Sequence, residues 1–156
     1  NFWMRSLPLS ATCHVDGKLH VRLSGTEKGV RAAVQRLGGS DVPFADELWE
    51  SLRDHYHRFF VAAKCLRIAL PPAVPYPDVG GTWLTEWAGA LRWLRTDAPV
   101  ADVVTAVRKL GGHTTAFHPA LHVAPLDAVL LKYHRRLKAA FDPRGIFNRG
   151  RLFEDS

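Results

Sequence analysis

Two segments of the chain repeat one pattern, and this repeat constrains the fold more than any other feature. Residues 30–39 and 103–112 share two valines, an alanine and a leucine at matching positions, and both end in Gly-Gly. Apolar residues at helical spacing and a basic last turn predict a helix in each segment, and the glycines suit the left-handed conformation that often ends a helix. The chain therefore contains two equivalent helical units.

Each repeated helix lies between two segments with the character of β-strands. Residues 19–23 and 90–95 precede the two helices, and residues 65–70 and 113–117 follow them. Two strand-helix-strand units in tandem predict an α+β fold of the ferredoxin-like type. We expect an antiparallel sheet of about four strands with the two helices on one face.

Three further segments extend this plan. Residues 46–60 carry one apolar stripe at helical spacing and predict an inserted helix beside the sheet, while residues 71–81 hold four prolines and two glycines and predict a loop. Residues 125–141 predict a C-terminal helix whose apolar face packs and whose basic face meets water or a partner. Its apolar residues are Leu126, Val129, Leu130, Tyr133, Leu137 and Phe141.

The end of the chain has the features of a docking tail. Pro143 lacks an amide proton and disfavours the helical conformation at Asp142, so the helix must stop there. Ile146 and Phe147 then form a separate apolar anchor. Asn148 and Gly150 suit a tight turn that brings backbone amides close to a partner group.

Basic residues gather around this tail. They permit three interpretations: a solvated face, a contact with phosphate, or a docking surface for another chain. Their junction with the apolar anchor favours docking. These residues are Lys132, Arg135, Arg136, Lys138, Arg144, Arg149 and Arg151.

Composition sets broad limits. A chain of 156 residues, 47% hydrophobic and 23% charged, suits one globular domain, and no run approaches the roughly 18 apolar residues that span a bilayer. Cys13 and Cys65 are far apart and predict buried free thiols in a reducing compartment. The net charge of +6 permits nucleic acid, phosphate groups or an acidic protein as partner.

The sequence offers few groups with the pattern of catalytic or ligand-binding residues. The closest histidine pairs have no acidic or thiol ligand at a diagnostic spacing, so we expect no metal site. No Gly-x-Ser-x-Gly or Gly-x-Gly-x-x-Gly motif occurs. His113, at the start of a strand, is a candidate for proton transfer or an ordinary half-buried side chain. Trp83, Trp87 and Trp93 form either an aromatic face for a planar ring or part of the core.

Several motifs of the chain resemble the FAD-linked oxidases of the vanillyl-alcohol oxidase type. Asp142-Pro143, an apolar pair and an Asn-x-Gly turn follow the C-terminal pattern of that family, although Arg149 stands where the family has proline. With Leu91-Arg-Trp-Leu94, residues 111–117 and residues 131–138, the resemblance extends to the FAD-binding subunit of bacterial glycolate oxidases. It covers most of residues 1–153.

The resemblance implies that residues 1–156 are a single C-terminal cap domain, whose parent protein carries a separate N-terminal FAD-binding domain outside this chain. The parent would oxidise glycolate to glyoxylate with FAD and pass electrons to an iron-sulfur subunit, in the cytoplasm or peripheral to the inner membrane through partner subunits. Asn148, Gly150 and Arg151 would lie near the FAD. We expect no FAD on this chain alone, and the resemblance leaves open whether the chain has activity of its own.

A second hypothesis is a stand-alone ferredoxin-like binding or protein-interaction module without flavin chemistry. An RNA-binding version would show a glycine-aromatic run on a central strand, and neither residues 19–23 nor residues 113–117 contain one. We therefore expect no nucleic acid partner.

Overall fold

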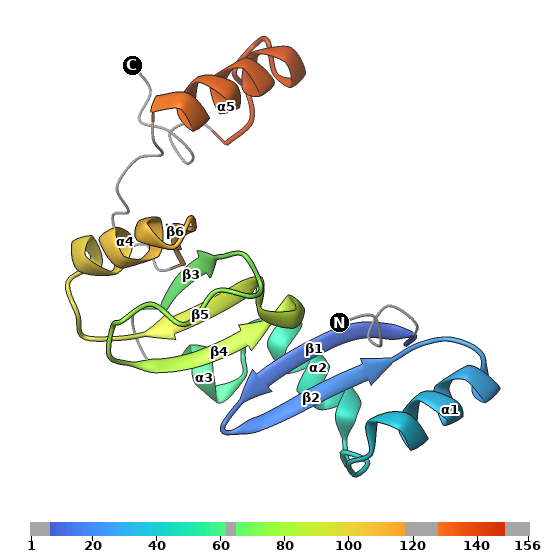
Figure 1. The fold of residues 1–156 in the computed structure, drawn as a ribbon. Helices are drawn as coiled ribbons and strands as arrows, with labels where there is room; N and C mark the ends of the chain where they lie inside the picture. Colours follow the sequence, from blue (N-terminus) through green and yellow to red (C-terminus); the bar gives the residue numbers. More distant parts are fainter. Residues whose placement is uncertain (1–6, 62–64, 118–127, 149–156) are drawn as a thin grey trace. The chain divides into compact units, whose positions relative to one another are not determined.

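A computed structural model describes residues 7–61, 65–117 and 128–148. The chain divides into two units, Asn1–His122 and Val123–Ser156, each of which is considered by itself (Figure 1). The first unit is an antiparallel sheet with helices, and the second contains one helix. The α+β class is therefore confirmed.

The sheet of the first unit has six strands in the order β2-β1-β4-β5-β3-β6, all paired antiparallel. A short 3-10 turn at Trp87–Gly89 joins β4 to β5. The second unit holds α5 (Ala128–Phe141). In chain order the first unit contains β1 (Leu9–Val15), β2 (Lys18–Leu23), α1 (Glu27–Leu37), α2 (Ala45–Arg53), α3 (Arg58–Val61), β3 (Cys65–Ala69), β4 (Thr82–Glu86), β5 (Leu91–Arg95), α4 (Val100–Lys109) and β6 (His113–Ala116).

Both repeated helices form where the sequence predicts them, as α1 and α4. The Thr26 hydroxyl accepts the Gly29 N–H at the start of α1, and Gly38 follows its end with φ at 68°. Gly111 follows α4 with φ at 75°. Left-handed glycines therefore end both helices, as the repeat indicates.

The strand arrangement differs from the expected four-stranded plan. β2 pairs with β1 through the turn at Asp16 and Gly17, where φ is 52° and 73°. Asp-Gly with two left-handed residues is the preferred connection of a two-residue hairpin, so this local pairing places β2 at the sheet edge. β1 and β4 separate β2 from the three other strands of the repeat. A ferredoxin-like order would have placed β2 among them.

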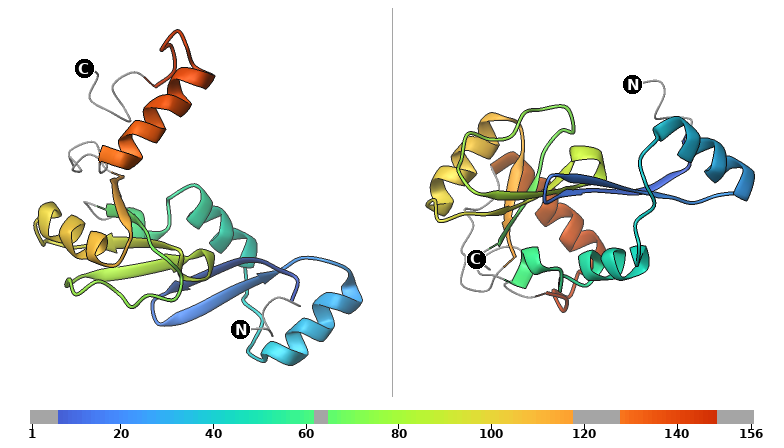
Figure 2. Two further views of the ribbon diagram at one scale, coloured as in Figure 1. Left: turned by 45° about the horizontal axis from the view of Figure 1, so that its top comes forward. Right: turned by 90° about the horizontal axis from the view of Figure 1, so that it is seen from below.

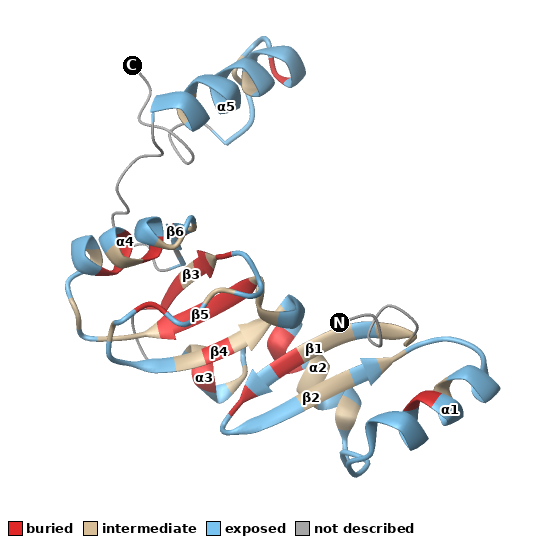
Figure 3. Cartoon of the chain, viewed as in Figure 1, coloured by how far each residue is buried: buried red, intermediate tan, exposed pale blue. Residues whose placement is uncertain are grey.

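Helices lie on both faces of the sheet (Figure 2). The expectation that the two repeated helices cover one face stays a prediction. Figure 2 shows α4 on one side of the sheet and α2 with α3 on the other. In β5 the side chains of Leu91 and Trp93 are buried on one face, and those of Arg92 and Leu94 on the opposite face. Figure 3 accordingly colours β5 mostly as buried. Apolar residues on both sides of this strand require cover on both faces. We call the two faces the α2 face and the α4 face.

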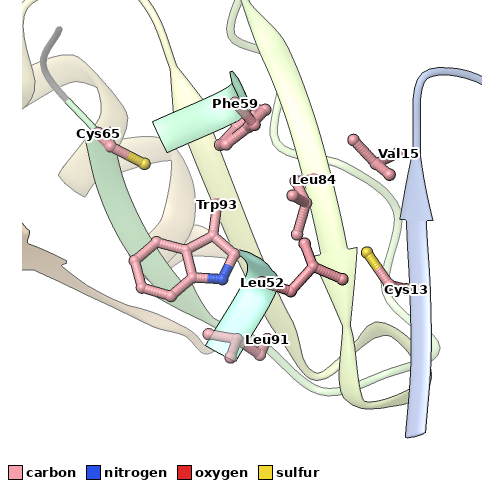
Figure 4. Close-up of a cluster of buried hydrophobic side chains, with 8 residues drawn as sticks. All are labelled: Cys13, Val15, Leu52, Phe59, Cys65, Leu84, Leu91 and Trp93. Atoms are coloured by element: carbon pink, nitrogen blue, oxygen red, sulfur yellow. The ribbon is translucent and has the colours of Figure 1, made fainter. Parts of the chain in front are cut away.

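The α2 face holds a hydrophobic cluster (Figure 4). Leu48, Trp49 and Leu52 of α2 and Phe59 of α3 pack against the sheet, so the predicted helix at 46–60 exists as two helices. His55 interrupts it with a φ of 59°. The cluster comprises Cys13, Val15, Leu52, Phe59, Cys65, Leu84, Leu91 and Trp93.

Both cysteines are free and buried in this cluster, as predicted. Burial raises the pKa of the Cys13 and Cys65 thiols to about 12, because the apolar surroundings disfavour the thiolate. Neither thiol is therefore a reactive nucleophile at neutral pH.

A buried arginine fastens the loop at residues 71–81 over the α4 face. Arg92 donates hydrogen bonds to the backbone oxygens of Val74, Pro75 and Gly89 at 2.7, 2.9 and 3.0 Å. Its guanidinium lies 4.7 Å from the centre of the Tyr76 ring. Because these carbonyls have a charged donor, the proline-rich loop can lie against the sheet beside the buried Leu94.

No helix within the described residues is long and apolar enough to cross a bilayer.

Replacing Arg92 with methionine is expected to lower the free energy of unfolding by about 3 kcal/mol, because three carbonyls lose a charged donor. Urea unfolding followed by tryptophan fluorescence measures the change. Arg31→Met is the control, because Arg31 forms an exposed ion pair with Glu27 on α1 and its loss is expected to cost only ~0.5 kcal/mol. Equal effects of the two substitutions would contradict the role assigned to Arg92.

Candidate docking site on the C-terminal unit

The C-terminal helix ends at the predicted residue, and Asp142 organises the segment that follows. We call residues 142–148 the hook. The Asp142 carboxylate accepts the backbone N–H groups of Ile146 and Phe147, each at 2.9 Å. The Lys138 ammonium donates to the same carboxylate and to the Phe147 carbonyl. The hook therefore has a defined conformation within its own unit.

Asp142 is buried, and its neighbours stabilise its charged form. The hydrogen bond from Lys138, followed by those from Ile146 and Phe147, lowers the pKa of the carboxyl to about 2. The sequence indicated Asp142 only as the end of a helix. The signal for its further role was its position ahead of Pro143, where an aspartate side chain commonly binds backbone amides further along a turn.

The hook holds two large apolar side chains in solvent. Ile146 is 56% exposed and Phe147 is 65% exposed. Because the turn is held by hydrogen bonds, these apolar side chains can be removed from water only when another surface covers them. The predicted apolar anchor is thus present.

The apolar face of α5 has the same character. The expectation that this face packs is not met within the described part of the second unit, because no residue of α5 is buried (Figure 3). Residues 125–127 of the predicted helix lie outside the described residues. The exposed apolar side chains are Val129, Leu130, Tyr133, Leu137 and Phe141.

Basic residues accompany the apolar surface of this unit. Lys132, Arg135, Arg136 and Arg144 are exposed, whereas Lys138 is half-buried beside Asp142. Arg149 and Arg151 lie outside the described residues. The charges suit an acidic partner surface and increase the rate of encounter with it.

The residues assigned to the cofactor by resemblance are described only in part. Asn148 is exposed and has a φ of 50°, a left-handed conformation that asparagine tolerates better than most residues. It follows Phe147 directly, so it belongs to the same displayed surface. Gly150 and Arg151 lie outside the described residues, and their contact with FAD stays a prediction.

His113 is the first residue of β6 in the first unit. It is exposed and lies opposite Ala69 of β3. The structure places it on a sheet, at the start of its edge strand, as the sequence predicts. Its part in proton transfer stays a hypothesis.

The three tryptophans do not form one aromatic face. Trp93 is buried in the α2 face, where its indole N–H donates to Glu86 at 2.8 Å. Trp83 packs against the Tyr76 ring at 5.1 Å, and Trp87 is exposed on the turn between β4 and β5. Of the two alternatives, core packing is therefore confirmed for Trp93, and the three tryptophans together provide no aromatic face for a planar ring.

In the part of the chain that is described, no three histidine, cysteine, aspartate or glutamate side chains are grouped to hold a metal ion. His55 contacts the rings of Phe60, Trp93 and Phe117. His57 accepts the Phe59 N–H at 3.2 Å, and burial lowers the pKa of its ring. His118 and His122 lie outside the described residues.

The part of the chain that includes the docking site is similar to known proteins. Residues 92–152 match the family described as FAD linked oxidases, C-terminal domain. Over 154 residues the chain is 40% identical to the glycolate oxidase subunit GlcE of Escherichia coli (strain K12), a match that covers 97% of this chain and 43% of that protein. The chain thus spans less than half the length of this relative. No solved structure matches it.

Acidification is expected to leave the hook intact until the pH falls well below the usual range of carboxyl groups. The folded pKa of Asp142 is depressed to about 2, against roughly 3.9 for an unperturbed aspartate, so its stabilisation is complete above the ordinary value and is lost as the pH falls toward 2. Amide NMR signals of Ile146 and Phe147 report this transition.

Asp142→Asn is the control for this titration, because an amide keeps acceptor capacity but neither titrates nor pairs with Lys138. A transition of the two amides near pH 4 in the unmodified chain would show that the carboxylate is not held in the way described.

Proposed function

We propose that this chain, whose residues 92–152 match the C-terminal domain of the FAD linked oxidases, is the cap domain of a flavin-dependent subunit similar to glycolate oxidase subunit GlcE. The parent protein would remove two electrons and two protons from glycolate, or a related 2-hydroxy acid, to give glyoxylate. Its partners would include an iron-sulfur subunit that takes the electrons. We place it in the cytoplasm or at the inner membrane through those partners.

When bound in the parent protein, FAD supplies the electron acceptor for this oxidation. The described residues of this chain contain no glycine-rich cradle for its phosphates, and the exposed Asn148 beside Phe147 suits a contact at the edge of a cofactor held elsewhere. The chain's share is accordingly to cover the flavin and exclude water from it. The flavin-binding domain of the parent would hold the cofactor itself.

The observation that carries this proposal is the display of Ile146 and Phe147 on a turn already fixed by Asp142. A segment that has its bound conformation before binding loses little conformational entropy when it docks. Burying two large apolar side chains then contributes to affinity with little opposing cost. The apolar face of α5 would extend the same contact.

The basic residues of α5 support an acidic partner surface. Arg135 and Arg136 lie in the same unit as the hook and are exposed. Opposite charges steer association and fix the orientation of the complex. This assigns the basic face to docking instead of phosphate binding.

A stand-alone binding or protein-interaction module is the alternative, and one observation favours it. The first unit has a sheet with buried residues on both faces, so it can hold a core without the second unit. Under this alternative the first unit would act as a binding module by itself, and α5 with the hook would bind a protein without touching flavin.

The proposal predicts that the chain reassembles with the flavin-binding half of the parent protein when the two are produced as separate polypeptides. The isolated chain is expected to lack the visible flavin absorption band, and the pair is expected to show it. Phe147→Asp should weaken association by at least about tenfold, because roughly 1.5–3 kcal/mol of apolar burial is lost. Affinity capture followed by flavin absorbance measures both results.

Leu19→Asp is the matched control, because Leu19 is 66% exposed on β2 in the other unit. It is expected to leave association unchanged. Flavin bound to the isolated chain, or equal loss of association in the two variants, would contradict the proposal that another domain holds the flavin and this chain covers it through the hook. If the chain associates with the flavin-binding half and Phe147→Asp has no effect, the hook is not part of the contact.

A further inference from the structure

Part of the α2 face over β3 and β6 is incompletely buried, beside the rings of His55, Phe60 and Phe117 that pack on Trp93. Arg67 and Ala69 of β3 are half-buried, whereas His113 and Thr115 of β6 are exposed. Arg67 lies opposite Thr115, and Ala69 lies opposite His113. Since directly paired residues of an antiparallel sheet project to the same face, these four side chains form one block.

The structure distinguishes three arginines of the central strands by their contacts. Arg92 is occupied by three backbone carbonyls on the α4 face. Arg95 shares the α2 face and lies 5.7 Å from the centre of the Phe59 ring. The Arg67 guanidinium lies near two indoles, 5.8 Å from the centre of the Trp87 ring and 6.0 Å from the centre of the Trp93 ring.

The guanidinium of Arg67 has ring contacts but no acceptor among the residues that the structure describes. A guanidinium offers five N–H donors in a planar fork that matches a carboxylate. Two indole rings restrict the side chain, so part of the entropy cost of orienting it is met before a ligand binds. A half-buried donor set of this kind suits an anion from outside the chain.

The surroundings of Arg67 add a second donor and a small side chain. The Thr115 hydroxyl, directly across from Arg67, forms no hydrogen bond within the described ranges. Ala69 carries only a methyl group between Arg67 and His113 on this face. Glu86, the carboxylate of β4 on the same face, accepts the Trp93 indole N–H and does not pair with Arg67.

We propose that Arg67 and Thr115 form a subsite for a small carboxylate, with Ala69 as its floor and Trp87 as its wall. The carboxylate would accept two parallel N–H bonds from Arg67 and the O–H of Thr115. The identification of the ligand as the carboxylate of a 2-hydroxy acid rests on the proposed function. His113, the next residue of β6 on this face, lies opposite Ala69.

Titration of the isotopically labelled full chain with glycolate tests the subsite, at constant ionic strength and with glycolamide as the uncharged analogue. NMR signals of the Arg67 side chain, the Thr115 amide and the Trp87 indole are expected to shift and saturate with glycolate only. Arg67→Met should weaken this binding by at least about tenfold, and Arg67→Lys should fall between, because lysine keeps the charge without the fork.

Arg95→Met is the matched control, since Arg95 is on the same face, contacts one ring and has no acceptor in the described part of the chain. It is expected to leave glycolate binding unchanged. Thr115→Val keeps the size of the side chain without its hydroxyl and should weaken binding severalfold. This second variant carries the test if Arg67→Met does not fold, which thermal unfolding reveals.

Four results would overturn the subsite: no saturable shift with glycolate, equal shifts with glycolamide, equal losses for Arg67→Met and Arg95→Met, or unchanged affinity for Thr115→Val. None of them depends on association with the flavin-binding half. Failure of glycolate binding with intact association would therefore reject the subsite and keep the proposed function. Glycolate binding without association would reject the proposed function and keep the subsite.

Discussion

Burial of β5 on both of its faces is the constraint on which the first unit depends. Leu91 and Trp93 join the cluster under α2 and α3, while Arg92 and Leu94 lie on the face that α4 covers. The strand therefore couples two cores that neither set of helices could complete alone. It also fixes the position of functional groups, because its pairing with β3 sets Arg67 beside Trp93 and its buried Arg92 fastens the loop at 71–81.

The second unit differs from the first, because its apolar residues have a fixed conformation but remain exposed to solvent. Asp142 follows the last residue of α5 and fixes the hook, yet Ile146 and Phe147 remain in solvent. Each unit thus offers one open surface: a guanidinium with a hydroxyl in the first, and a basic apolar surface in the second. Under the proposed cap function, a flavin-binding domain would use both surfaces, one as a substrate anchor and the other as a cover.

The sequence predicts features that depend on neighbours along the chain. The glycine caps of α1 and α4 and the proline stop after Phe141 are local effects, and the structure confirms them. The hairpin at Asp16-Gly17 is equally local, and its turn residues are the signal that could have predicted it. The sequence could not distinguish the roles of Arg67, Arg92 and Arg95, because these roles depend on partners that are distant along the chain. Arg92 binds carbonyl oxygens 17 and 18 residues away, and Arg67 lies opposite a threonine of another strand. The split of the helices between two faces likewise depends on strand pairing.

The central claim is that another domain covers the hook and the apolar face of α5. Hydroxyl-radical labelling of the parent protein with FAD bound, compared with the isolated chain, tests it most directly. We predict that oxidation of Phe141, Ile146 and Phe147 falls severalfold in the parent protein, while oxidation of the exposed Leu19 on β2 stays the same. Equal oxidation of the three hook and helix residues in both samples would contradict the account.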